Sequence, residues 1–122
     1  MAETRDLLRI HYPAFADLRD KLGMATTYTA SDGFVHWHVV LSTSSYSLDI
    51  GDDRADWAFD IKPAGRKNYT SITRVLHRLG LWVDPHVRPN AAELARVFED
   101  NLDKVLKALE SDVFWRSLGH RE

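Results

Sequence analysis

The chain has 122 residues, of which 44% are hydrophobic and 28% are charged, and its formal net charge is −2. The apolar content excludes an intrinsically disordered chain, and the charge excludes the strongly basic surface that binds nucleic acid without sequence preference. No cysteine is present, which excludes disulfides, thiol nucleophiles and cysteine-based zinc sites. The length predicts a single domain over residues 1–122.

The first residues, MAETRDLLRIHY, carry charges where a signal peptide needs an apolar run. No segment approaches the roughly 20 apolar residues of a membrane span. The sequence therefore predicts a cytoplasmic protein without a membrane partner.

The N-terminal segment predicts an amphipathic helix, because leucine and aromatic residues recur every three or four positions from Leu8 to Leu22. Pro13 lacks a backbone N–H, so we expect the helix to kink there or a second helix to begin. Gly23 is expected to end the helix in the left-handed conformation.

The middle of the chain alternates between apolar and polar residues, which is typical of half-buried strands. We expect a short strand at 25–30 and longer strands at 34–41, 46–50 and 57–62. The segments STSS and GDDRAD (51–56) are expected to form the turns between them. This pattern predicts an antiparallel meander of three to four strands with one buried face.

The period becomes helical after Gly65. Thr70 or Ser71 is expected to cap a helix that ends before Gly80, and an extended connection follows at 81–89. Asn90 then caps a long helix over 91–109.

The predicted fold class is α+β: an N-terminal helix, the antiparallel meander, and two or more C-terminal helices packed on one face of the sheet. Near the end of the chain, Phe114-Trp115-Arg116 is expected either to close the core or to form an exposed contact site. The hydroxyls of Tyr28, Tyr46 and Tyr69 are expected to reach water.

A nuclease-like motif, Asp60-Ile-Lys62, ends the last expected strand. In metal-dependent nucleases, two acidic residues on neighbouring strands hold a divalent cation, and a nearby lysine helps to position the attacking water. If Leu48 pairs with Phe59, Asp49 lies diagonally from Asp60 on the outward face and Lys62 joins them. A motif of three residues is common by chance, so we favour the interpretation that these residues are the solvated side of a half-buried strand.

His36 and His38 have the spacing of two metal ligands on one strand face, with Asp49 as a candidate third ligand. Two histidines without a fixed third ligand are weak evidence for a metal site. The favoured interpretation is a half-exposed pair in which His38 forms a hydrogen bond with Asp49, and no metal or cofactor is predicted.

An acidic segment surrounds the last expected turn and contains Asp49, Asp52, Asp53 and Asp56. Its order does not match a calcium-binding EF-hand loop. It is either a solvated turn, partly neutralised by Arg54, or an acidic projection that meets a basic partner.

The order of four phrases, GFVHWHV, DDRADWAFDI, YTSITRVLHRLG and AELARVFEDNLDKVLKAL, resembles a broad group of small bacterial α+β proteins. Some of that group are immunity proteins of polymorphic toxin systems. The resemblance covers about residues 5–110 and implies stoichiometric binding of a toxin inside the producing cell, without shared catalytic residues. The implied partner is a basic toxin domain, and the residues expected to bind it are Asp49, Asp52, Asp53, Asp56 and Asp60.

The sequence thus predicts a non-enzymatic protein-binding module, an immunity-type inhibitor with a protein partner and no nucleic acid. Two alternatives stay open: a small metal-dependent nuclease that uses Asp49, Asp60 and Lys62, and a structural or assembly subunit that pairs through helix 91–109.

Overall fold

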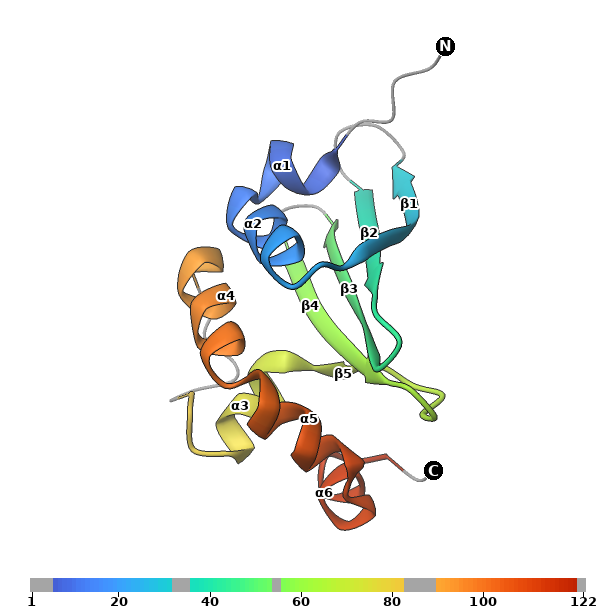
Figure 1. Cartoon of the computed structure of the whole chain (residues 1–122), viewed down its shortest axis with the longest axis vertical. Coiled ribbons are helices and arrows are strands. Elements are labelled where there is room, and N and C mark those ends of the chain that lie inside the picture. The colour runs from blue at the N-terminus through green and yellow to red at the C-terminus, as the bar shows by residue number, and fades with distance from the viewer. Residues whose placement is uncertain (1–5, 32–35, 54–55, 83–89, 121–122) are drawn as a thin grey trace.

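The computed structural model describes residues 6–31, 36–53, 56–82 and 90–120. It shows N-terminal helices, a five-stranded antiparallel sheet and C-terminal helices packed against that sheet (Figure 1). The predicted α+β class is confirmed, with one strand more than the sequence indicated.

The N-terminal helix predicted from the sequence is two helices, α1 (Leu7–His11) and α2 (Pro13–Lys21). Pro13 occupies the first turn of α2, where a missing N–H costs nothing, and Tyr12 between the helices has a non-helical backbone. Gly23 has φ 64°, which confirms the left-handed position predicted after the helix.

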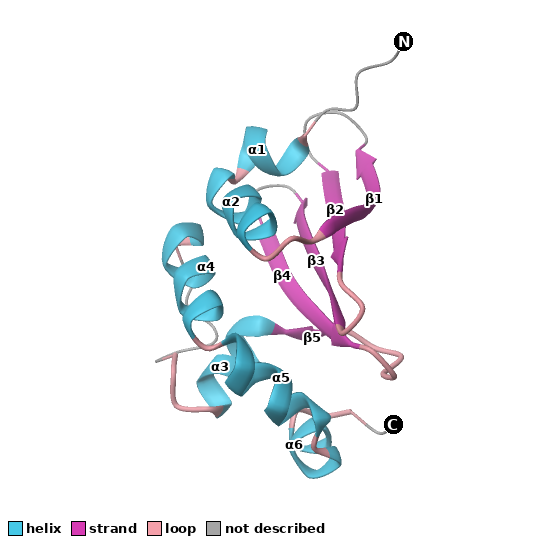
Figure 2. Cartoon of the chain, in the orientation of Figure 1, coloured by secondary structure: helices cyan, strands magenta, loops and turns pink. Residues whose placement is uncertain are grey.

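The sheet has the strand order β1-β2-β3-β4-β5, and every neighbouring pair is antiparallel (Figure 2). The strands are β1 (Ala25–Ser31), β2 (His36–Ser42), β3 (Tyr46–Asp53), β4 (Asp56–Pro63) and β5 (Thr70–Ser71). The predicted turn over 51–56 is wrong in extent, because β3 and β4 continue to pair until only residues 54–55 lie between them. A hairpin with so short a loop lets the ladder of hydrogen bonds include residues of low strand propensity.

The C-terminal helices are α3 (Ile72–Arg78), α4 (Ala91–Asp100), α5 (Leu102–Glu110) and α6 (Asp112–Ser117). The caps predicted at Ser71 and Asn90 are confirmed, since both side chains accept backbone N–H groups of the helix that follows. The extended connection predicted at 81–89 falls largely on 83–89, outside the described residues.

The single helix predicted over 91–109 is wrong, because it breaks at Asn101. The side-chain amide of Asn101 donates to the carbonyl of Val97 over 2.8 Å, and φ at residue 101 is −120°. A side chain that takes the place of a backbone donor in this way ends one helix and lets the next begin at a new angle. Across the described segments, no helix is long and apolar enough to cross a membrane.

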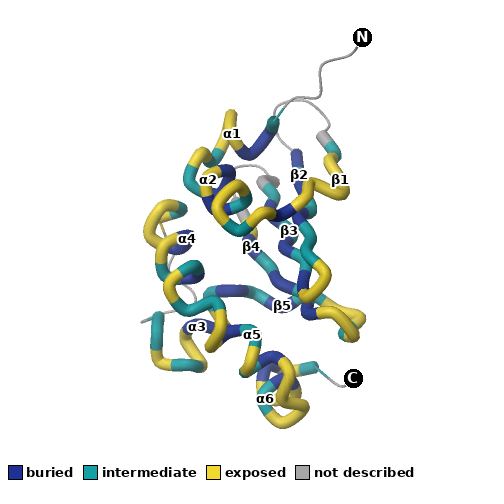
Figure 3. The backbone as a smooth tube through the Cα atoms, viewed as in Figure 1, coloured by how far each residue is buried: buried dark blue, intermediate teal, exposed yellow. Residues whose placement is uncertain are grey.

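The core lies between the helices and one face of the sheet, as the dark segments of Figure 3 show. Phe59 of β4 lies at its centre, with its ring centroid 4.9 Å from that of Phe15 in α2 and 5.3 Å from that of Phe98 in α4. Each such side chain contributes roughly 1.5–3 kcal/mol when it is fully buried. The aromatic contacts therefore join both helical segments to the sheet.

The C-terminal helix α6 closes the core with Trp115, which is 0% exposed. The Arg66 guanidinium lies 5.1 Å from the centroid of this ring. Arg74 donates to the carbonyl of Leu118 over 2.9 Å, and Arg78 donates to that of Ser117 over 2.6 Å. Cations at the carboxyl end of a helix are stabilising, so this end of the chain is fastened to α3.

Candidate functional site

The three central strands have two chemically different faces. The inner face carries the buried residues Trp37, Val39, Leu41, Tyr46, Leu48, Ile50, Phe59 and Ile61. The outer face carries polar residues that are neither fully buried nor fully exposed, including His38, Asp49, Asp60 and Lys62. Because alternate residues of a strand point to opposite faces, the side that has no core packing collects the polar residues.

Asp49 and Asp60 are directly opposite each other on β3 and β4. The predicted pairing of Leu48 with Phe59, and with it a diagonal arrangement of the two acids, is wrong: Leu48 pairs with Ile61. The short connection at 54–55 determines this register, since hairpin length sets which residues face each other. Like charges directly opposite each other on a sheet are destabilising.

The environment of Asp60 confirms that conflict. Burial and the neighbouring Asp49 carboxylate raise the pKa of Asp60 above its ordinary value. Within the described part of the chain, the carboxylate of Asp60 has no hydrogen-bond or ion-pair partner, and the backbone neighbour of this residue on β5 is Ser71.

His38 reaches Asp49 across the sheet, with 3.2 Å between Nδ1 of the imidazole and Oδ1 of the carboxylate. The predicted hydrogen bond between these residues is therefore confirmed. The other neighbour of His38 is Tyr28 of β1, at 5.1 Å between ring centroids. Tyr28 is 54% exposed, so it presents an aromatic surface to solvent.

Gly51 lies opposite His38 and makes room for it. A Cβ atom at position 51 would lie 2.8 Å from Cβ of His38 and 3.0 Å from the carbonyl oxygen of Trp37. Real Cβ atoms do not approach this closely, so a side chain here would displace the imidazole from Asp49.

Tyr69 borders the two acids at the other end of the face. Burial and the Asp49 carboxylate raise the pKa of its hydroxyl, and a hydrogen bond with Ser47 acts in the opposite direction. Lys62 lies on the same face, with Nζ 5.9 Å from the centroid of the Tyr69 ring. Among the described residues this ammonium forms no ion pair with Asp49 or Asp60, so a direct lysine contact does not relieve the repulsion between the two acids.

The other predicted acidic residues lie at the hairpin end of the same two strands. The backbones of Asp52 and Asp53 belong to β3 and that of Asp56 to β4, with Asp53 paired with Asp56. Their side chains, and that of His36, lie outside the described residues. In the part of the chain that the structure describes, no group of three His, Asp or Glu side chains is arranged to hold a metal ion.

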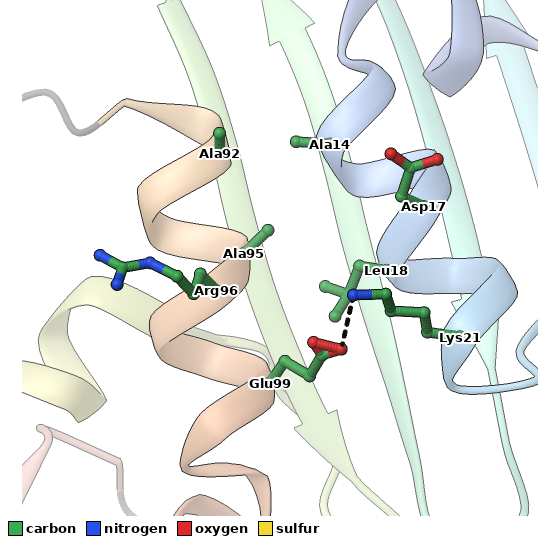
Figure 4. A pocket seen from close by; sticks show the side chains of 8 residues that line it. All are labelled: Ala14, Asp17, Leu18, Lys21, Ala92, Ala95, Arg96 and Glu99. Carbon is green, nitrogen blue, oxygen red and sulfur yellow. Dashed lines mark ion pairs between the residues drawn. The ribbon is translucent and has the colours of Figure 1, made fainter.

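A separate cleft of about 260 Å³ lies between α2 and α4 (Figure 4). Its wall is formed by Ala14, Asp17, Leu18, Lys21, Ala92, Ala95, Arg96 and Glu99. Lys21 and Glu99 join the two helices across it, with 3.4 Å between Nζ and Oε1. The sequence contained no signal for this cleft, because helices far apart in the chain form it. The wall has two acidic and two basic side chains, so its charge favours neither an anionic nor a cationic ligand.

The outer face of the sheet is thus the best candidate site. We define the acidic face as Tyr28, His38, Asp49, Asp60 and Tyr69. Its tyrosines were predicted only to have wet hydroxyls. That Tyr28 contacts His38 and that Tyr69 lies near the two acids was not evident from the sequence. Comparison of the chain with protein-family models, with curated proteins and with solved structures finds no match.

Proposed function

We propose that this protein is a non-enzymatic binding module, an immunity-type inhibitor that neutralises a basic toxin domain through its acidic face. One observation carries the proposal. Asp49 and Asp60 face each other on the open side of the sheet, and no arginine or lysine within the described residues pairs with them.

Two carboxylates that face each other across paired strands destabilise the free protein and favour a complex with a cation. A guanidinium placed between the two acids removes their repulsion and favours the ionised form of Asp60, whose pKa is raised in the free chain. Arginine fits this position better than lysine, because its planar fork can donate to both carboxylates and stack on an aromatic ring. Basic toxin domains, nucleases above all, carry such residues at their phosphate-binding sites.

The aromatic members of the acidic face supply contact area around the charges. Tyrosine is enriched among the residues that contribute most to protein interfaces. Tyr28 already contacts the ring of His38, and Tyr69 has Ser47 as a hydrogen-bond partner. Tyr28 stands on a paired strand and Tyr69 directly precedes β5, so the backbone positions of both are fixed close to paired strands and little conformational entropy is lost there when a partner binds.

The inhibitor would act in the cytoplasm of the cell that makes the toxin. There its acidic face would occupy the phosphate site of the toxin, so that the nucleic acid substrate is excluded. Charge complementarity of this kind raises the association rate and selects the partner, and it weakens as salt concentration rises.

The test is a titration of the purified chain with the protein encoded by the neighbouring gene, followed by calorimetry. We expect a one-to-one complex whose dissociation constant rises roughly 30-fold, or about 2 kcal/mol, in the variant Asp49→Asn/Asp60→Asn. The variant Asp100→Asn/Asp103→Asn is the matched control: it loses the same charge from exposed positions on α4 and α5 and should bind normally. If both variants weakened binding equally, the loss of affinity would follow from net charge alone, and the assignment of the acidic face would be overturned.

The nuclease alternative requires a separate experiment, because Asp49, Asp60 and Lys62 do share one face of the sheet. The purified chain is incubated with plasmid DNA and Mg²⁺ or Mn²⁺, beside the variant Asp60→Ala. We expect intact plasmid in both samples. Cleavage that the substitution abolishes would replace the binding module with an enzyme.

A further inference from the structure

Strand β1 is exposed on both of its faces over residues 25–29. The five consecutive residues from Ala25 to Thr29 are all exposed, whereas Trp37, Val39 and Leu41 of the adjacent β2 are buried at alternate positions. Figure 3 shows the contrast between β1 and the buried central strands. The helices therefore do not cover the inner side of this strand, which is held by its pairing with β2.

The outer edge of β1 is also free. β1 is the first strand in the order of the sheet, so one row of its backbone N–H and C=O groups has no partner strand among the described residues. The opposite edge is protected differently: β5 has two residues and continues directly into α3. A long free edge is a template for another strand unless charges, proline or a bulge block it.

The sequence of β1, ATTYTAS, contains no charged residue and no proline. Threonine and tyrosine favour extended backbone and pack well on paired strands. The one protective feature is a register shift between Thr26 and Tyr28, which leaves Thr27 as an extra residue. This edge is therefore much less defended than an edge that has to remain unpaired in solution.

We propose that β1 pairs antiparallel with β1 of a second copy of this chain, across a two-fold axis near Tyr28, and joins the two sheets into one of ten strands. Tyr28 is the middle residue of Ala25–Ser31, so this position of the axis allows the longest overlap. It also brings the two exposed Tyr28 rings side by side, and cross-strand aromatic pairs are stabilising.

The lack of charge on β1 favours a second copy over the basic toxin domain. A strand without acids offers a basic partner no complementary charge, whereas an uncharged strand meets its own copy without repulsion. The aspartates of the acidic faces do not oppose the dimer. Asp49 and its counterpart lie on β3 of each copy, five strand spacings or about 24 Å apart, well beyond the screening length of about 8 Å at physiological salt.

Analytical ultracentrifugation over a range of micromolar concentrations tests this proposal on the full chain. We expect a monomer–dimer equilibrium in the native protein. Tyr28→Lys and Tyr28→Glu should each raise the dimer dissociation constant about tenfold or more, because the aromatic pair is lost and like charges meet at the axis. An equimolar mixture of the two variants should recover association, since a lysine then faces a glutamate.

Val113→Lys and Val113→Glu are the controls, because Val113 of α6 is 78% exposed and distant from β1 in sequence. They should dimerise like the native chain. Thermal unfolding checks that each Tyr28 variant is folded, and Thr29→Lys with Thr29→Glu serves as a second pair if one is not. A native chain that stays monomeric, or a dimer that the β1 variants leave unchanged, would overturn the proposal. The variant Asp49→Asn/Asp60→Asn should still dimerise, which separates this test from that of the proposed function.

Discussion

Two groups of aspartates in this protein have opposite surroundings. Asp6, Asp17 and Asp20 of the N-terminal segment form an ion-pair network with Arg9 and Arg19. Asp49 and Asp60 of the acidic face have each other, His38 and Tyr69 as neighbours, and no arginine partner among the described residues. The first group stabilises the fold. In the second group the two carboxylates repel each other, and a basic partner can relieve that repulsion.

The pKa values have the directions that this difference implies. The hydrogen bonds from Arg19, at 3.0 and 2.8 Å, lower the pKa of Asp6. Burial and Asp49 raise the pKa of Asp60. An aspartate is therefore structural in the N-terminal segment, where arginines pair with it. On the acidic face, without an arginine partner among the described residues, an aspartate is available for recognition.

The largest expected effect comes from giving the acidic face an arginine of its own. Asp60→Arg should pair with Asp49 across the strands and occupy the position that we assign to the partner's guanidinium. We expect the neighbouring gene's product to bind about 100-fold more weakly, or about 3 kcal/mol, while unfolding in urea shows no loss of stability. Unchanged binding in calorimetry would mean that the partner does not use this pair.

The converse change removes a carboxylate from the ion-pair network. Asp6→Ala loses both hydrogen bonds to Arg19 and the cap of α1, in which the side chain accepts from the Arg9 backbone N–H over 3.1 Å. We expect a loss of about 1–2 kcal/mol in the free energy of unfolding, measured with urea. Partner affinity should stay within about twofold of the native value, since Asp6 is not part of the acidic face. A large loss of affinity would contradict the separation of the two groups.

A smaller effect of opposite sign is expected from Asp60→Asn. This substitution keeps the size of the side chain and removes the like-charge pair, so it should raise the free energy of unfolding at neutral pH by up to about 1 kcal/mol. The same measurement on Asp103→Asn provides the control, because Asp103 is exposed in the first turn of α5 and faces no second acid across a strand. If Asp60→Asn destabilises the chain instead, the carboxylate has a structural role.

The pH dependence should separate the two groups as well. The lowered pKa of Asp6 means that its contribution to stability is present above the unfolded-state pKa and is lost as pH falls through the folded-state value. For Asp60, whose folded-state pKa is raised, the cost is absent at low pH, where the carboxyl is protonated in both states, and appears as pH rises through that pKa. The stability difference between Asp60→Asn and the native chain should therefore grow from acid to neutral pH, whereas that between Asp6→Ala and the native chain should become more negative. Urea unfolding at several pH values measures both trends.

Much of the secondary structure was readable from local signals. Pro13, Gly23, Ser71 and Asn90 mark helix boundaries through properties of the residue itself, and the alternation in β2–β4 predicted which side of the sheet is buried. The break at Asn101 was missed, because the apolar stripe continues across it and asparagine is tolerated inside helices. Of the acidic face, the outward direction of Asp49 and Asp60 was predicted, but their direct pairing was not.

The sequence by itself determined the α+β class, the apolar face of the sheet and the outward position of the acids, because helix and strand periods are local properties of the chain. Only the tertiary structure decided which side chains lie next to each aspartate. Strand register and the packing of distant segments placed an arginine beside Asp6 and a second aspartate opposite Asp60, and within the described part of the chain they left residues 25–29 of β1 exposed. These relations join residues that lie far apart along the chain, and so they depend on the closure of the whole fold.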